Sequence, residues 1–374
     1  MADTKKIILT VIGYIGIAIV LVATVVAVLL ITFLNDDRYS DGSQTIEPVD
    51  PANFRYPTSM AGYSEYTNTS TIFQVMFIAD NDNNNKDASD KRYTKVHFGL
   101  LSKVDGQWTY APRDSKDITV YSEYTYKGRG VETSEIVQFF DKTYVFDDKT
   151  GIASELNVNK KEYYSRMIMA DGNGNSENGA KHEWGTVVGN HMYLGSHGRN
   201  STNLDGQQGR WEKYYVFKVN RDMSYTVENW LEVYTRIDAL LGITSEGYTT
   251  HEAVVYSNMK RKWYFCPRKV SKTNWVESVD NLERAGKYII EADENKDNMK
   301  FVIDKQYNEK RCFSSVKLLP YNEDIMVYLK TYENGDTVES WIGMTNVKTG
   351  EVVMEEVSLG TDKYEGLEIV PLSY

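Results

Sequence analysis

The fold class is decided by the stretch from Ser315 to Leu359, which reads SVKLLPYNEDIMVYLKTYENGDTVESWIGMTNVKTGEVVMEEVSL. Four apolar runs of strand length alternate in it with the turn segments YNED, NGD and KTG. Runs of this kind, joined by short segments rich in Gly, Asn and Asp, are typical of β-hairpins. The stretch therefore predicts one unit of four antiparallel strands.

The same order of strand, turn and strand occurs earlier in the chain. It is seen in IVQFF, TYVFDD and IASEL from Ile136, in TVV and HMYLGS around Val187, and in AVVY and WYFCPRK around Val254. Repeated four-stranded units predict an all-β protein of the β-propeller type. A β-sandwich is the alternative, but about 305 residues of strand pattern is long for one sandwich and fits five or six blades. The clearest helical pattern is Glu228–Ile243, with Gly242 near its end.

The N-terminal region carries a long apolar segment, Ile7–Leu34, without a charged residue. It exceeds the roughly 20 residues that span a bilayer, and so predicts a transmembrane signal-anchor helix. A cleaved signal peptide, with a shorter apolar region, is the less favoured alternative. Lys5 and Lys6 before the segment and Asp36 and Asp37 after it place the N-terminus in the cytoplasm. We expect a single-pass type II membrane protein of the Golgi, the endoplasmic reticulum or the cell surface, with a soluble form after cleavage.

These features divide the chain into four segments: a cytoplasmic tail (1–6), the membrane helix (7–34), a polar stalk (35–68) and the propeller (69–374). Sequons at Asn68 and Asn200 suit a lumenal or external chain that carries glycans. Cys266 and Cys312 are the only cysteines. In an oxidising compartment they either form a disulfide or remain two buried thiols.

The charge of the chain restricts its ligands. Because the net charge is -11 and the pI is about 5.1, nucleic acid is not an expected partner. A small ligand bearing phosphate would need a metal or a few basic residues. No P-loop string and no nucleophile-elbow string occurs in the sequence, and we interpret His182 and His251 as channel-lining or structural.

Five residues with side-chain oxygens lie just before or at the start of apolar strands: Ser134, Glu183, Glu252, Ser314 and Glu365. In a propeller the first strand of every blade lines the central channel, so residues at equivalent places converge. Three carboxylates and two serine oxygens, hydroxyl or carbonyl, suit a hard cation such as Ca²⁺, and the absence of a His/Cys cluster argues against zinc. Taken singly, each residue is better explained as a solvated residue or a turn partner. The regular spacing favours the metal site.

Nine strings together carry a family resemblance. They are FIAD (77–80), KGRGVETSEI (127–136), FDDKTG (146–151), DGNGNSENGAKHEW (171–184), ENW (228–230), GYTTHEA (247–253), WYFCPRK (263–269), FSSVKLLP (313–320) and KYEGLEIV (363–370). In content and order they resemble the soluble calcium-activated nucleotidase family of apyrases. The departures lie in loops, chiefly NDNNNKDAS and the stretch after Arg199.

The resemblance implies a five-bladed β-propeller with one Ca²⁺ in its central channel, and nucleoside di- and triphosphates as substrates. The five residues of the ring match the family's calcium ligands. Asp80 of FIAD and Asp148 of FDDKTG match acidic residues needed for activity. We assign Asp80 as the general base for water attack and Asp148 as a carboxylate that orients the water, although DDKTG is also an ordinary hairpin turn.

Three basic residues, Arg129, Lys181 and Arg268, are candidates for binding the substrate phosphates. A surface salt bridge is the usual role of a single arginine. The main hypothesis is a calcium-dependent apyrase. A propeller that binds calcium only structurally, as a non-catalytic binding module, is the alternative, and a propeller lactonase or phosphotriesterase is disfavoured by the nine strings.

Overall fold

The computed structural model describes residues 65–66, 70–81, 85–202 and 208–374. The chain divides into two compact units, Met1–Pro48 and Val49–Tyr374, and every described residue belongs to the second unit. The expected tail (1–6), the expected membrane helix (7–34) and Asn68 lie outside the described residues. Within the described ranges, no helix is long and apolar enough to cross a membrane.

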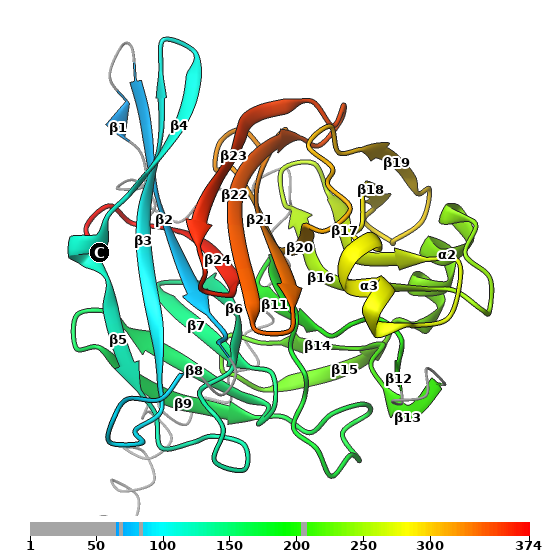
Figure 1. The fold of residues 1–374 in the computed structure, drawn as a ribbon, viewed down its shortest axis with the longest axis horizontal. Helices are drawn as coiled ribbons and strands as arrows, with labels where there is room; N and C mark the ends of the chain where they lie inside the picture. Colours follow the sequence, from blue (N-terminus) through cyan, green and yellow to red (C-terminus); the bar gives the residue numbers. More distant parts are fainter. Residues whose placement is uncertain (1–64, 67–69, 82–84, 203–207) are drawn as a thin grey trace, which may run out of the picture. The chain divides into compact units, whose positions relative to one another are not determined.

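The second unit consists mainly of five antiparallel sheets, which we call blades (Figure 1). In the second to the fifth blade the strands follow chain order from the inner to the outer strand. The second blade contains β6 (Thr133–Phe139), β7 (Lys142–Asp147), β8 (Ile152–Asn157) and β9 (Glu162–Ile168); the third contains β10 (Trp184–Val188), β11 (His191–Gly195), β14 (Tyr215–Val219) and β15 (Tyr225–Asn229). The fourth contains β16 (Tyr248–Ser257), β17 (Lys262–Ser271), β18 (Tyr288–Asp293) and β19 (Lys300–Ile303); the fifth contains β20 (Cys312–Leu318), β21 (Ile325–Asn334), β22 (Thr337–Asn346) and β23 (Val352–Gly360).

The first blade joins strands from distant parts of the sequence. Its inner strand is β24 (Tyr364–Val370), which pairs antiparallel with β2 (Ser70–Ala79). The other strands of this sheet are β1 (Glu65–Tyr66), β3 (Tyr93–Val104), β4 (Gln107–Pro112) and β5 (Ile118–Tyr121), with the short helix η4 (Asp114–Lys116) between β4 and β5. The pairing of β24 with β2 closes the circle of blades.

The inner strands form a closed ring. Along the chain, β6 contacts β10, β10 contacts β16, β16 contacts β20 and β20 contacts β24, which in turn contacts β6. The prediction of an all-β, five-bladed β-propeller is therefore confirmed, and the β-sandwich is excluded.

The hydrophobic core is divided into five clusters, one between each pair of neighbouring blades. In β16, Ala253 and Val255 pack against the fifth blade, whereas Val254 and Tyr256 pack against the third. Both faces of the strand are buried, so its sequence is a continuous apolar run rather than an alternating one. Each fully buried side chain of this kind contributes roughly 1.5–3 kcal/mol of transfer free energy.

Two helices and one hairpin are inserted between the strands. The helix α2 (Leu231–Leu241) lies within the predicted range and ends at Gly242, whose φ of 68° is the left-handed conformation common at helix ends. The helix α3 (Glu277–Glu283), between β17 and β18, was not expected. The hairpin of β12 (Asn200–Thr202) and β13 (Gln208–Glu212) interrupts the third blade, and the sequon residue Asn200 begins it.

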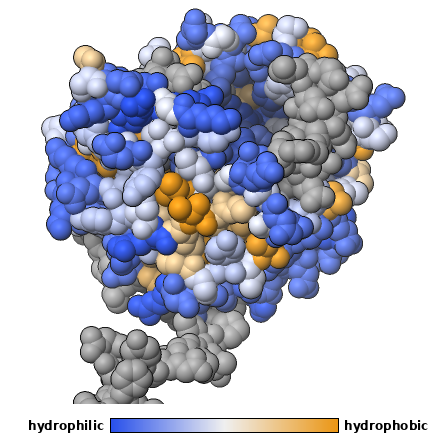
Figure 2. All heavy atoms as spheres, turned by 90° about the horizontal axis from the view of Figure 1, so that it is seen from below, coloured by the Kyte–Doolittle hydropathy of each residue, from blue (hydrophilic) through white to orange (hydrophobic). Residues whose placement is uncertain are grey.

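Two further expectations have outcomes. Glu65 and Tyr66, placed in the stalk (35–68), form β1 and pair with β2. Cys266 and Cys312 are both buried and free, so the alternative of two buried thiols is confirmed. Figure 2 shows a face that is mostly hydrophilic.

Candidate functional site

The five expected metal ligands occupy equivalent places on the five inner strands. Ser134 lies on β6, Glu252 on β16, Ser314 on β20 and Glu365 on β24, while Glu183 directly precedes β10. All five are buried. The structure therefore brings each of them to the central channel; we call this set the ring.

Irregular strand pairing accompanies the ring. Ser134, Ser314 and Glu365 are each the extra residue of a β-bulge on the inner strand. Glu252 lies in the part of β16 where the register against β17 shifts. Bulges change the direction of a side chain and are common beside active sites. The neighbouring residues of the inner strands pack against the two adjacent blades. The bulges explain how the ring residues can turn away from this packing towards the channel.

The two serine hydroxyls tie neighbouring inner strands together. The Oγ of Ser134 donates a hydrogen bond to the carbonyl oxygen of His182, the residue before Glu183. The Oγ of Ser314 donates to the carbonyl oxygen of Tyr364, the residue before Glu365, at 2.9 Å. Each hydroxyl oxygen keeps lone pairs that can accept a further bond or bind a cation.

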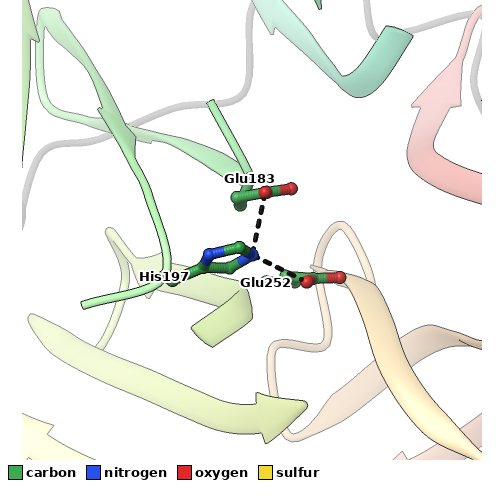
Figure 3. Close-up of side chains that lie close together, drawn as sticks. All are labelled: Glu183, His197 and Glu252. Carbon is green, nitrogen blue, oxygen red and sulfur yellow. Dashed lines mark hydrogen bonds and ion pairs between the residues drawn. The ribbon is translucent and has the colours of Figure 1, made fainter. Parts of the chain in front are cut away.

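An unpredicted histidine connects two carboxylates of the ring (Figure 3). The Nε2 atom of His197 lies 2.9 Å from Oε1 of Glu183 and 3.2 Å from Oε1 of Glu252. Burial alone would lower the pKa of His197, but these two carboxylates outweigh it and raise the pKa above its ordinary value. The side chain comes from the segment after β11, where no sequence pattern indicated a site.

The two acidic residues assigned to catalysis also come together. Asp80 follows β2, Asp148 follows β7, and both are buried. One oxygen from each, with one from the buried Glu132, lie within 4.8 Å of one another. Oδ1 of Asp148 has no hydrogen-bond partner among the described residues. Glu132 was missed by the sequence reasoning, although it lies in the string KGRGVETSEI.

Lys181 joins this acidic cluster to the ring. Its Nζ atom contacts the carboxylates of both Asp148 and Glu183. Burial disfavours the charged forms of Lys181, Asp148 and Glu183, but the attraction between the ammonium and the two carboxylates outweighs it. The pKa of Lys181 is therefore well above its ordinary value, and the pKa of Glu183 is well below its ordinary value. Because Lys181 contacts an acid of each group, it connects the acidic cluster to the ring.

The other basic residues are also bound to carboxylates. Arg129 forms an ion pair with Glu132, and Arg268 contacts Glu252, at 2.6 Å, and Glu333. All three basic candidates form ion pairs with carboxylates of the ring or of the acidic cluster: Arg129, Lys181 and Arg268. None of them is a lone surface salt bridge.

Lys363, which the sequence reasoning did not single out, completes this arrangement. Its Nζ lies 2.9 Å from Glu365 and 3.6 Å from both Asp80 and Glu333. Burial raises the pKa of Glu365 well above its ordinary value, and Asp80 and Glu252 add to the rise while Lys363 opposes it. Buried carboxylates this close together stay ionised only if nearby cations offset their mutual repulsion.

The donor set of the ring fits a hard divalent cation. Its side chains offer only oxygen atoms, three of the five residues carry carboxylates, and all five are buried, four of them on the inner strands and Glu183 directly before β10. Calcium prefers such ligands. Lys181, His197 and Lys363 lie at these carboxylates and neutralise part of their charge.

The two histidines interpreted as channel-lining or structural are packed against aromatic rings. His182 and His251 are fully buried, and their rings contact Phe146 and Phe265 respectively. Burial lowers the pKa of each to about 3. Both are therefore neutral near pH 7 and contribute packing rather than charge.

Comparisons of the chain with a family model and with known proteins agree on one family. The family model described as Apyrase matches residues 80–370. The chain is 31% identical over 352 residues to an apyrase of Cimex lectularius, covering 91% of this chain and 93% of that protein. It is 32% identical over 305 residues to an apyrase of Phlebotomus duboscqi, covering 80% and 89%. It is 29% identical over 304 residues to soluble calcium-activated nucleotidase 1 of Mus musculus, covering 80% and 74%.

Proposed function

The chain belongs to the apyrase family, and from this premise we propose that it is a calcium-dependent enzyme that hydrolyses the terminal phosphoanhydride of nucleoside di- and triphosphates. One observation carries the proposal. A buried acidic cluster of Asp80, Glu132 and Asp148 is joined through Lys181 to the oxygen ligands of the ring. A purely structural calcium site does not need that cluster.

The reaction is an attack of water on the terminal phosphorus. Asp80 accepts the proton as the oxygen–phosphorus bond forms, and the bond from phosphorus to the bridging oxygen breaks. The products are orthophosphate and a nucleotide shorter by one phosphate. Asp80 lines a cavity of about 590 Å³, large enough to receive a nucleotide. Asp148, whose Oδ1 has no partner among the described residues, orients the attacking water.

The phosphates of the substrate bring several negative charges to this site. Arg129, Lys181 and Arg268 bind them in this proposal, with Lys363 as a fourth cation. All four ammonium or guanidinium groups are already held beside the acidic residues by ion pairs. Cations fixed in place before the substrate arrives stabilise developing charge without reorganising.

Calcium is the proposed cofactor. Ser134, Glu183, Glu252, Ser314 and Glu365 would hold it, and the name of the mouse relative, a calcium-activated nucleotidase, supports this choice. When bound, Ca²⁺ supplies a Lewis acid for the phosphate oxygens.

We further propose that the enzyme is a single-pass type II membrane protein with its propeller in the lumen or outside the cell. The support is the uncharged segment Ile7–Leu34 with Lys5 and Lys6 before it.

The decisive experiment measures phosphate release from UDP, GDP, ADP and ATP by the purified protein, with calcium and with a chelator. We expect hydrolysis with calcium and little or none with the chelator. No release from any of the four by folded protein in millimolar calcium would favour the non-catalytic binding module instead. Full activity with the chelator would refute the calcium requirement alone.

A further inference from the structure

A second cavity, of about 230 Å³, lies between the fourth and the fifth blade. Residues of β17, α3 and β21 line it, among them Arg268, Lys269, Asn281 and Glu333. Because the guanidinium of Arg268 also bonds Glu252 at 2.6 Å, the cavity adjoins the ring. It shares Glu333 with the larger cavity that Asp80 lines.

Lys269 is the unusual residue of this cavity. Its side chain is buried, with 8% relative exposure, yet among the described residues it forms no ion pair. Its Nζ donates one hydrogen bond, to Oδ1 of Asn281 at 2.7 Å, and lies 4.5 Å from the centre of the Trp275 ring. An ammonium has three donors, so capacity for further bonds remains.

Other buried lysines in the chain have carboxylate partners. Lys330 lies 2.5 Å from Asp304, and Lys317 lies 3.2 Å from Glu135. A buried charge without an ion pair is costly, and buried groups with perturbed pKa values cluster at functional sites. Burial lowers the pKa of Lys269 and the charge of Arg268 adds to this, while the more distant carboxylates of Glu333 and Glu252 act in the opposite direction without outweighing burial.

We propose that this cavity is a phosphate subsite and that Lys269 binds a phosphoryl group in it. Asn281, from α3, accepts the hydrogen bond that orients the ammonium. The subsite rests on the proposed function for its substrate class. Two sources supply the same chemistry: a non-reacting phosphate of the bound nucleotide, or the orthophosphate that the reaction releases.

The test compares Lys269→Met and Lys269→Arg with a matched control, Lys296→Met. Lys296 is also a partly buried lysine of the fourth blade, over the ring of Trp230 at 4.8 Å, but it does not line the cavity. For each variant in saturating calcium, kcat and KM for ADP and ATP, inhibition by orthophosphate and the melting temperature are measured. We expect Lys269→Met to lower kcat/KM about 10-fold or more, since a hydrogen bond to a charged group is lost.

Three further results are expected. Lys269→Arg should retain more activity than Lys269→Met, because it keeps the charge. The melting temperature of Lys269→Met should not fall, since an apolar side chain replaces a buried charge that forms no ion pair. Lys296→Met should keep wild-type kinetics.

The kinetic pattern separates the two sources of phosphate. A raised KM with unchanged inhibition by orthophosphate assigns the subsite to the nucleotide. Weaker inhibition by orthophosphate with little change in KM assigns it to the product. If KM and inhibition by orthophosphate both keep their wild-type values in Lys269→Met, the proposal is overturned. It is also overturned if Lys269→Met loses activity together with a lower melting temperature and Lys269→Arg loses as much activity.

Binding separates this inference from the proposed function. If the wild type hydrolyses no nucleotide, calorimetric titration with inorganic pyrophosphate still tests the subsite. Weaker binding by Lys269→Met than by Lys296→Met would then support the subsite while the proposed function fails. Equal binding by both variants would overturn the subsite.

Discussion

The Nζ atom of Lys363 lies 2.9 Å from Oε1 of Glu365. The same ammonium is 3.6 Å from Asp80, the proposed general base. A cation of the protein therefore neutralises a carboxylate that is also proposed to bind calcium. Calcium bound by the ring would compete with Lys363 for Glu365, and both cations would favour the binding of a phosphate nearby.

Replacing Lys363 by Met should separate these effects. We expect several-fold tighter calcium binding, because ligand charge is one of the terms that sets calcium affinity. At saturating calcium, kcat/KM for ATP should fall about 10-fold, since a phosphate contact is lost. Calcium titration measures the calcium affinity, and steady-state kinetics measure kcat/KM for ATP. Lys363→Arg is the control that keeps the charge. Weaker calcium binding in Lys363→Met would show that the ammonium supports the ring rather than competing with it.

The acids of the ring and the acid of the cluster should respond differently to neutral substitution. Glu183→Gln and Glu365→Gln each remove one charge from the ring, so we expect weaker calcium binding and activity that excess calcium partly restores. Asp80→Asn should abolish most activity at any calcium concentration and largely spare calcium binding. Calcium titrations of binding and of phosphate release decide the matter. Activity of Asp80→Asn that calcium restores would contradict the assigned roles.

Glu333 should contribute stability that depends on pH. Burial opposes its ionisation, but Lys363 and Arg268 outweigh burial and lower its pKa from 4.5 to about 2. The contribution is therefore complete above about pH 5 and is lost as the pH falls towards 2. Urea unfolding should show Glu333→Gln less stable than wild type by about 2 kcal/mol at pH 6, with a smaller difference at pH 3.5. A difference that does not change with pH would refute the link to ionisation.

Removal of the N-terminal region should leave an active enzyme. A chain that begins at Val49 keeps all the described strands, and we expect it to be soluble and to hydrolyse nucleotides at the full rate. A chain that begins at Thr69 loses β1 and its pairing with β2, and should be less stable by about 1–2 kcal/mol. Phosphate release and urea unfolding are the measurements. Normal calcium binding without hydrolysis in the Val49 chain would place part of the active site before residue 49.

The membrane orientation is tested in sealed vesicles of known sidedness. Protease should reach the propeller only from the lumenal or external face, because Lys5 and Lys6 retain the N-terminus in the cytoplasm. Glycans on Asn68 or Asn200 would agree. Digestion of the propeller from the cytosolic face would refute the type II orientation.

The sequence predicted the strands and the places of the ring residues because both follow from local periodicity. Runs such as AVVY are buried on two faces, and the first residues of equivalent strands must converge when blades surround a channel. The run IVQFF predicts a strand that includes Phe140, but β6 ends at Phe139 and Phe140 belongs to the turn before β7, with φ of 55°. A positive φ at a phenylalanine is rare and has no sequence signal.

Other parts of the site depend on contacts between distant segments. His197 reaches Glu252, 55 residues away, and Lys363 reaches Asp80 in the closing blade. No local pattern marks either residue, since each lies in a short polar segment between strands. The bulges at Ser134, Ser314 and Glu365 were not predicted, because the strand register that defines them exists only in the assembled sheets.

The pairing of β24 with β2 also determines when the enzyme can first become active. Glu365 lies on β24, which follows every other described strand in the chain, so the ring lacks a carboxylate until the ribosome has released that segment. A nascent chain can fold its earlier blades during synthesis, but it cannot complete the proposed calcium site. The proposed hydrolysis therefore requires that the segment Tyr364–Val370 has been translated and has paired with β2, almost 300 residues earlier in the chain. We expect a premature stop codon before Tyr364 to abolish this activity, even though four blades remain encoded.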